Sequence, residues 1–145
     1  MNYPLTSINP NAIIGSNVQI DPFTVIHEDV QIGEGSWIGS NVTIFPGARI
    51  GKNVKIFPGA VISAIPQDLK FGGEITTAEI GDNTTIRECV TVNRGTSDRQ
   101  KTVIGPNCLI MAYVHIAHDC VIGNNNICSS YQSTLFLIPI RSIRC

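Results

Sequence analysis

Two histidines and an aspartate, His115, His118 and Asp119, lie within five residues of one another in the last third of the chain. A histidine beside a carboxylate and near a second histidine can act as a general base, because an imidazole can be tuned to accept a proton at neutral pH. Such help typically contributes about 10²–10⁴ in rate. His118 and Asp119 are therefore the candidate catalytic pair, and the surrounding sequence must supply the elements that position them.

Isoleucine recurs at every sixth residue in the first part of the chain, and the same phase returns after a gap. The positions are Ile8, Ile14, Ile20, Ile26, Ile32, Ile38, Ile44, Ile50, Ile56 and Ile62, then Ile80, Ile86, Val92, Ile104, Ile110, Ile116 and Ile122. A period of six predicts a short strand and a turn that repeat, which is the hexapeptide pattern of a parallel β-helix. We therefore expect an all-β fold.

Other hexad positions support this fold. The fifth residue is usually small or β-branched, as in Val18 and Val30, so two side chains per hexad should point inward. The second residue is often glycine, with Asn or Asp two residues later, and such residues tolerate corner conformations, including positive φ. Three hexads would close one triangular coil, which is left-handed in hexapeptide families. A β-sandwich is the alternative, but its strands would not keep one phase from residue 8 to residue 122.

The repeat breaks at residues 63–79, where Asp68 and Glu74 stand at the isoleucine positions. A β-helix core could not bury these carboxylates unpaired, so the break predicts an extruded loop. Loops that interrupt a rigid scaffold commonly carry binding groups. Gln67, Asp68 and Lys70 would offer an acceptor, an anion and a cation to a polar ligand, although a solvated surface loop is the simpler alternative.

The composition excludes several classes of protein. The 145 residues are 43% hydrophobic and 14% charged, which suits one globular domain. A net charge of -1 with scattered Lys and Arg leaves no basic field for nucleic acid. The sequence has no apolar run of membrane-spanning length and no signal-peptide pattern at its N-terminus, so we expect a cytoplasmic protein.

The five cysteines match no metal-binding or redox spacing, and reduced structural thiols are expected. His27 follows Ile26 at a corner and is interpreted as a surface or subunit-contact residue. His115, His118 and Asp119 occupy the sixth, third and fourth positions of their hexads, so none should point into the core. A site of three His ligands between subunits, as in γ-class carbonic anhydrases, would need a wider His spacing, and we expect no metal.

The chain resembles the acyl-carrier-protein-dependent UDP-N-acetylglucosamine O-acyltransferases that open lipid A synthesis. The resemblance covers residues 1 to about 127 and depends on specific stretches: Gln67-Asp68-Leu69-Lys70-Phe71, Gly73-Glu74, Ile80-Gly81-Asp82, Ile86-Arg87-Glu88, Arg94-Gly95-Thr96 and His115-Ile116-Ala117-His118-Asp119-Cys120. It implies a left-handed parallel β-helix. It also implies transfer of a 3-hydroxyacyl chain from acyl carrier protein to the 3-hydroxyl of UDP-N-acetylglucosamine, without a metal or another cofactor, by a homotrimer with sites between subunits.

The resemblance also assigns roles to residues. His118 would be the general base that takes the proton from the sugar hydroxyl, Asp119 would orient His118 or bind nearby, and His115 would line the site. Three residues of the first loop would hold the nucleotide sugar: Gln67, Asp68 and Lys70. Asn93 stands where many relatives have His, and it would contact the sugar or the acyl chain.

The sequence predicts a β-helix domain at 1–127, with extruded loops near 63–79 and 95–101, and an aberrant tail at 128–145. In the tail the isoleucine phase fails at Cys128 and Thr134, which indicates a truncated or frameshifted product. A different class of function therefore stays open, namely a catalytically silent trimeric β-helix that binds UDP-sugar or associates with intact subunits. The residues that set acyl chain length in the family would lie beyond this point.

Overall fold

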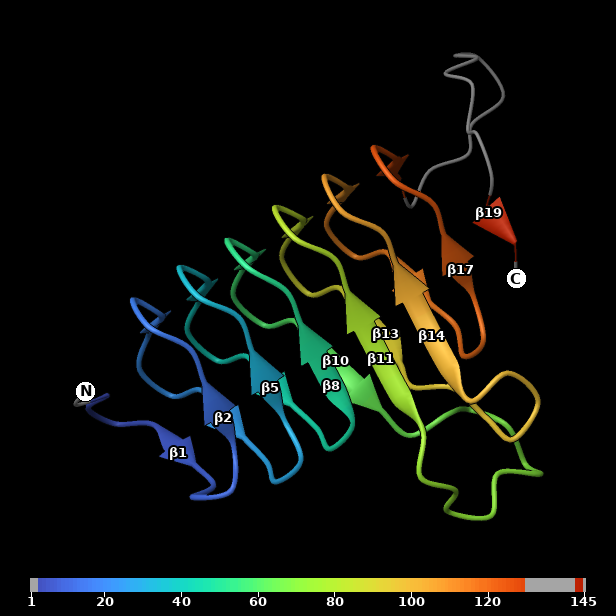
Figure 1. The fold of residues 1–145 in the computed structure, drawn as a ribbon, viewed down its shortest axis with the longest axis horizontal. Coiled ribbons are helices and arrows are strands. Elements are labelled where there is room, and N and C mark those ends of the chain that lie inside the picture. The colour runs from blue at the N-terminus through green and yellow to red at the C-terminus, as the bar shows by residue number, and fades with distance from the viewer. Residues whose placement is uncertain (1–2, 130–142, 145) are drawn as a thin grey trace.

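The structure, a computed structural model, describes residues 3–129 and 143–144, and every regular element in this part is a short β-strand. The strands are two to four residues long, and the chain turns sharply after each of them. Successive turns stack into an elongated coil with three flat sides, each of which is one β-sheet (Figure 1). The predicted β-helix of hexapeptide repeats is therefore present.

From β1 to β18, each sheet takes every third strand. Sheet A contains β1 (Ser7–Ile8), β4 (Val25–Ile26), β7 (Thr43–Ile44), β10 (Val61–Ala64), β13 (Thr91–Asn93) and β16 (His115–Ile116). Sheet B contains β2 (Ile13–Ile14), β5 (Gln31–Ile32), β8 (Ala48–Ile50), β11 (Thr77–Ile80), β14 (Lys101–Ile104), β17 (Val121–Ile122) and β19 (Ile143–Arg144). Sheet C contains β3 (Gln19–Ile20), β6 (Trp37–Ile38), β9 (Lys55–Ile56), β12 (Thr85–Ile86), β15 (Leu109–Ile110) and β18 (Ile127–Cys128).

The register follows the six-residue period. Ile26 pairs with Ile44, so one full coil takes eighteen residues, or three hexads. Ile50 pairs with Ile80, a separation of thirty residues, because the first loop adds twelve. The second loop adds six between Ile80 and Ile104. The strands of residues 3–129 pair in parallel, and β19 pairs antiparallel with β17. This topology excludes the sandwich alternative.

The core is a stack of isoleucines with smaller side chains between them. Ile38, Ile44 and Ile56 are fully buried, and so are fifth-position residues such as Val42. Stacking identical side chains removes a continuous apolar column from water, which is the main source of stability in such repeats. Where the fifth position is polar, a hydrogen bond satisfies it: the Thr24 hydroxyl donates to the Gly39 carbonyl at 2.9 Å.

The corners confirm the prediction of positive φ for the Asn and Asp residues of the hexad and correct it for the second-position glycines. Positive φ falls on the fourth residue of the hexad, where asparagine is common: Asn17, Asn41, Asn53, Asn83, Asn107 and Asn125. The second-position glycines do not have positive φ. They are needed because adjacent coils come close: a Cβ on Gly33 would lie 2.5 Å from the backbone of Gly51.

Both extruded loops leave the coil at the corner between sheets A and B. The first joins β10 to β11 and the second joins β13 to β14, and they project together from one side of the coil (Figure 1). Asp68 and Glu74 lie on the first loop, outside the core, as expected. The coil is therefore a rigid frame that holds two loops side by side.

The predicted end of the repeat at residue 127 differs slightly from the structure. Cys128 takes the isoleucine position on β18 and is 7% exposed, because a cysteine is small and apolar enough to fill it. Most of the predicted tail lies outside the described residues. Cys108 and Cys120 are buried thiols outside any disulfide, as predicted, and Cys145 is not described. No helix in the described part could cross a membrane.

Candidate active site

A pocket of about 320 Å³ lies between the two extruded loops and the corner that follows β16. Its lining is strongly polar and comes from three segments of the chain: Asp68, Lys70, Phe71, Glu74, Thr96, Ser97, Asp98, His118 and Asp119. A larger hollow of about 430 Å³ over sheet B is lined by none of the predicted site residues. The pocket between the loops is therefore the candidate active site.

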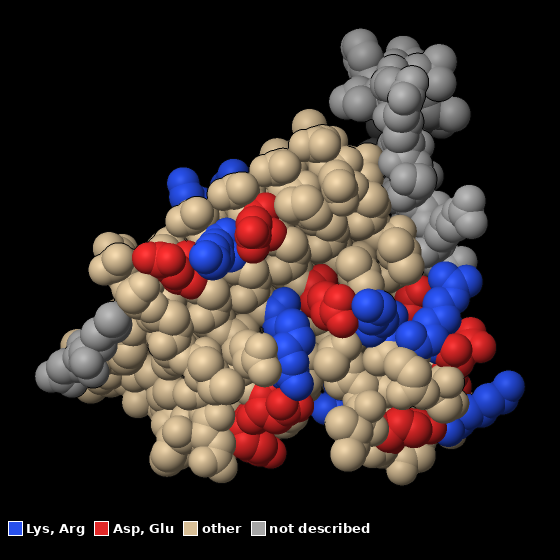
Figure 2. All heavy atoms as spheres, viewed as in Figure 1, with Lys and Arg blue, Asp and Glu red and all other residues tan. Residues whose placement is uncertain are grey.

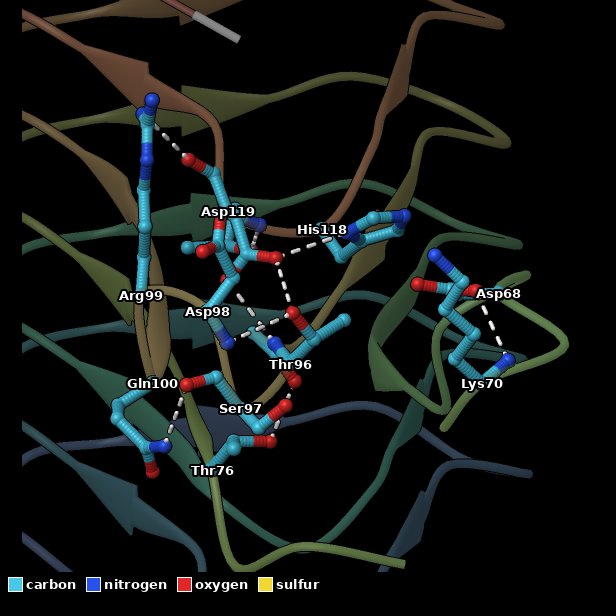
Figure 3. A network of polar contacts seen from close by, with 12 residues as sticks. Asp68, Lys70, Thr76, Thr96, Ser97, Asp98, Arg99, Gln100, His118 and Asp119 are labelled. Carbon is cyan, nitrogen blue, oxygen red and sulfur yellow. Dashed lines mark hydrogen bonds and ion pairs between the residues drawn. The ribbon is translucent and has the colours of Figure 1, made fainter. Parts of the chain in front are cut away.

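His118 and Asp119 form a hydrogen-bonded pair at this pocket. The Nδ1 atom of His118 lies 2.9 Å from Oδ2 of Asp119. Because a carboxylate can only accept, Nδ1 carries the hydrogen and Nε2 keeps a free lone pair in the neutral ring. The imidazole extends away from Asp119 toward the loop that carries Asp68 and Lys70 (Figure 3). This arrangement presents a proton acceptor to the pocket.

Asp119 is held more tightly than His118. Its side chain is 10% exposed, against 32% for His118. The backbone N–H of Thr96 donates to Oδ1 at 2.9 Å, and the Thr96 hydroxyl donates to Oδ2 at 2.5 Å. Burial raises the pKa of the Asp119 carboxyl, but hydrogen bonds from Thr96 and His118 outweigh it, so the pKa lies below its usual value. Asp119 is therefore an anion at neutral pH.

The opposite wall of the pocket comes from the first loop. The Oδ1 atom of Asp68 accepts the backbone N–H of Lys70 at 2.9 Å, which fixes a tight turn. Arg94 packs against this loop, because its guanidinium carbon lies 5.4 Å from the centre of the Phe71 ring. An anionic and a cationic side chain thus face the His118 side across one cavity.

Three residues predicted for the site do not line this pocket. Gln67 is exposed on the first loop. Asn93 is 3% exposed, and its amide donates to the Ile65 carbonyl at 3.0 Å, so it anchors that loop. His115 lies on the outer surface of β16, where its Nδ1 is 2.7 Å from the Thr91 hydroxyl. Roles in substrate binding for these three residues remain predictions.

The structure adds residues that the sequence did not single out. Thr96 was part of a motif without a role, and it contacts both oxygens of Asp119. Thr102 and Arg99 fix the Asp119 backbone: the Thr102 hydroxyl accepts its N–H at 2.9 Å, and the Arg99 guanidinium donates to its carbonyl at 3.2 Å. The only signal in the sequence was the position of these residues in and beside the second loop.

Charge around the site is mixed. Figure 2 shows acidic and basic side chains interspersed on the face that it displays, most densely around the two loops. Within the pocket, four carboxylates accompany one lysine. Among residues 3–129, no three His, Cys, Asp or Glu side chains are grouped to hold a metal ion.

Replacing Asp119 by asparagine is expected to lower the free energy of unfolding by about 1–3 kcal/mol at pH 7, because the charge-assisted hydrogen bonds from Thr96 and His118 weaken. The folded-state pKa of Asp119 is depressed, so its contribution is present above the unfolded pKa of about 3.9. The contribution is lost as pH falls through the lower folded pKa. Urea denaturation at pH 7 and pH 3 should show the difference shrinking.

Asp98 supplies the matched control, because it lies on the same loop and its side chain is exposed. Asp98→Asn should change the free energy of unfolding by no more than about 0.5 kcal/mol at either pH. Equal pH dependence in Asp119→Asn and the unchanged chain would contradict the role given to this carboxylate.

Two protein families that are built from hexapeptide repeats match parts of this chain. The family described as bacterial transferase hexapeptide (six repeats) matches residues 11–46 and 101–127. The hexapeptide repeat of succinyl-transferase matches residues 29–64. The three-sided coil and these matches place the chain in the class of hexapeptide-repeat transferases, which form a left-handed parallel β-helix.

Within this class, the chain is similar to several enzymes of known structure. A UDP-N-acetylglucosamine acyltransferase of known structure from Bacteroides fragilis is 56% identical with a TM-score of 0.86, covering 88% of this chain and 50% of that one. The Acinetobacter baumannii structure is 44% identical with a TM-score of 0.84, covering 86% and 49%. The chain is thus similar over most of its length to UDP-N-acetylglucosamine acyltransferases of known structure, and its curated relatives are named acyl-[acyl-carrier-protein]–UDP-N-acetylglucosamine O-acyltransferases.

The chain corresponds to only part of its relatives. The enzyme of that name from Chlorobaculum tepidum is 62% identical over 61 residues, which are 42% of this chain and 23% of the relative. The Aquifex aeolicus relative is 58% identical over 62 residues, which are 42% and 24%. The chain thus spans about half of the solved structures and about a quarter of these curated relatives.

Proposed function

We propose that the protein transfers a 3-hydroxyacyl chain from acyl carrier protein to the 3-hydroxyl of UDP-N-acetylglucosamine in the cytoplasm, the first step of lipid A synthesis. The relatives are named for acyl transfer to this sugar nucleotide. The observation that carries the proposal is the His118–Asp119 pair, whose imidazole extends into a pocket that also holds Asp68 and Lys70.

The chemistry uses Nε2 of His118 as the base. The sugar hydroxyl gives its proton to Nε2 as its oxygen attacks the thioester carbonyl, and an ester bond forms. The carbon–sulfur bond then breaks, and the proton leaves with the thiol of the carrier protein. Asp119 holds the Nδ1–H and stabilises the imidazolium that forms during the reaction.

The pocket suits the sugar part of the substrate. Its volume of about 320 Å³ is at the lower end of the range of roughly 300–1,000 Å³ for small-molecule sites. Asp68, Glu74 and Asp98 can accept hydrogen bonds from sugar hydroxyls, and Lys70 can donate to a neighbouring oxygen. A neutral, hydroxyl-rich group therefore fits a lining with more carboxylates than cations.

The test is acyl transfer itself. The purified chain is incubated with 3-hydroxyacyl carrier protein and UDP-N-acetylglucosamine, and the acylated nucleotide is measured by mass spectrometry. Formation of the 3-O-acyl product supports the proposal. A folded chain that binds UDP-N-acetylglucosamine by calorimetry but forms no product contradicts it, and would establish the silent sugar-binding protein instead.

We also propose that the protein acts as a homotrimer. The first loop exposes three large apolar side chains: Ile65 is 63% exposed, Leu69 106% and Ile75 93%. Apolar side chains gathered on a projecting loop mark a contact with another molecule, since burying each one stabilises an interface by about 1.5–3 kcal/mol. A second copy of the chain is the partner that this family implies.

Leu69→Ser is therefore expected to raise the dissociation constant of the trimer about tenfold or more, because the interface loses a buried leucine. Sedimentation equilibrium over a range of concentrations measures this constant. Leu5→Ser is the matched control, because Leu5 is 70% exposed on the first coil, far along the chain from the loop. It should leave the constant within about twofold. A wild-type chain that sediments as a monomer throughout would refute the trimer.

A further inference from the structure

The second loop is built as a closed turn that presents Thr96. The Gly95 carbonyl accepts the Thr76 hydroxyl at 2.6 Å, which ties the start of the loop to the segment before β11. At the other end, the Gln100 backbone N–H donates to the Thr96 carbonyl at 2.8 Å. Thr96 is 6% exposed, whereas the loop residues that follow it are exposed. The six extra residues of this coil thus place one buried threonine at a fixed point.

At this position Thr96 contacts the carboxylate of Asp119. The Thr96 backbone N–H donates to Oδ1 at 2.9 Å, and the Thr96 hydroxyl donates to Oδ2 at 2.5 Å (Figure 3). Two donors on two oxygens fix both the position and the plane of the carboxylate. Oδ2 accepts from the Thr96 hydroxyl and from Nδ1 of His118, which lies 2.9 Å away. The threonine and the histidine therefore meet on one oxygen atom.

The backbone of Asp119 is constrained as well. Its φ is +61°, a left-handed conformation that is uncommon for a residue other than glycine. The Thr102 hydroxyl and the Arg99 guanidinium hold the N–H and the carbonyl of this residue. Thr96, Arg99 and Thr102 lie on the second loop and on β14, so the sequence around the insertion is organised to fix one carboxylate.

We propose that Thr96 is a positioning residue for the acyl transfer, acting on His118 through Asp119. The inference depends on the proposed function, because it assigns a part of that reaction. By holding Oδ2 against Nδ1–H, Thr96 keeps the hydrogen of the neutral imidazole on Nδ1 and leaves Nε2 free to accept the proton of the sugar hydroxyl. The insertion in the second loop is then part of the catalytic apparatus without contacting the reacting atoms.

The kinetic arm compares Thr96→Val, which removes the hydroxyl and keeps the shape, with Thr96→Ser, which keeps the hydroxyl. Thr96→Val should lower kcat about tenfold or more and leave KM within about twofold, because a hydrogen bond to a charged group is lost. Thr96→Ser should restore kcat to within about threefold of wild type. Thr85→Val is the control, because Thr85 lies on the outer surface of β12 in sheet C. Equal kcat values for Thr96→Val and Thr85→Val would overturn the proposal.

The spectroscopic arm needs no turnover. Nitrogen-15 NMR of the His118 ring should show hydrogen on Nδ1 in the wild type and in Thr96→Ser, with a clear rise of the Nε2–H form in Thr96→Val. If the wild type transfers no acyl chain, the proposed function fails, and the tautomer ratio still decides whether Thr96 positions His118. An unchanged ratio in Thr96→Val overturns the inference. Thr96→Ala serves in the same way should the valine variant not fold.

Discussion

Replacing His118 by alanine is expected to lower kcat for acyl transfer by about 10²–10⁴, the range that a general base supplies. In the proposed mechanism Nε2 of His118 accepts the proton, since Nδ1 is engaged by Asp119. Without it, the sugar hydroxyl must attack while it still carries its proton. KM should change little, because Asp68 and Lys70 on the opposite wall are untouched. Initial rates at saturating carrier-protein substrate measure the effect.

His27→Ala is the matched control. His27 lies near the other end of the coil and stacks on Phe45 with ring centres 4.8 Å apart, so it tests the general effect of removing an imidazole. Its kcat should stay within about twofold of wild type. A His118→Ala variant that keeps more than about a tenth of wild-type kcat would show that another group accepts the proton.

Replacing Gly33 by alanine is expected to lower the free energy of unfolding by at least about 3 kcal/mol. A Cβ at this position would lie 2.5 Å from the carbonyl of Gly51 and 2.7 Å from the backbone nitrogen of Lys52. Overpacking usually costs about 1–3 kcal/mol, and here the obstacle is backbone that is hydrogen-bonded into the next coil, so relief requires two coils to separate. Urea denaturation at one fixed protein concentration measures the change.

Gly72→Ala provides the same substitution without the collision. The nearest atom to a Cβ at Gly72 is Oε1 of Glu74 at 3.8 Å, an ordinary contact on the first loop. Its free energy of unfolding should stay within about 0.5 kcal/mol of wild type. Similar losses in both variants would mean that chain flexibility, rather than the spacing of adjacent coils, explains the glycines of this corner.

The coil could be predicted from the sequence because every hexad has the same pattern of inward-pointing and corner residues. One isoleucine in six is weak evidence, but an unbroken series from Ile8 to Ile62 leaves one arrangement that packs all of them into a single core, in which Ile8 and Ile14 at the first coil are partly buried and the rest are buried. The role of the second-position glycines was misread. A tolerated positive φ and a close approach of backbones both select glycine, and the sequence alone does not distinguish them.

The site was predictable only in part. His118 and Asp119 are adjacent in sequence, so their pairing followed from local spacing, and Asp68 and Lys70 stood out as charges in a broken repeat. Thr96 lies 23 residues before Asp119, in a loop with no period to give its path. The resemblance gave Asn93 a contact with the substrate, and the structure adds that its buried amide anchors the first loop through the Ile65 carbonyl. Contacts of this kind depend on loop geometry, which the repeat does not encode.

The two insertions also have a low cost in chain entropy. An ordinary coil closes a circuit of eighteen residues, whereas the coils with the first and second loops close circuits of thirty and twenty-four. Because closure entropy grows only with the logarithm of length, the extra cost is roughly 0.5 kcal/mol for the longer loop and roughly 0.3 kcal/mol for the shorter. Both insertions are whole multiples of six, so the isoleucine stack resumes in phase after each. A β-helix of this kind can therefore acquire new surface chemistry one hexad at a time without disturbing the stacking of its core.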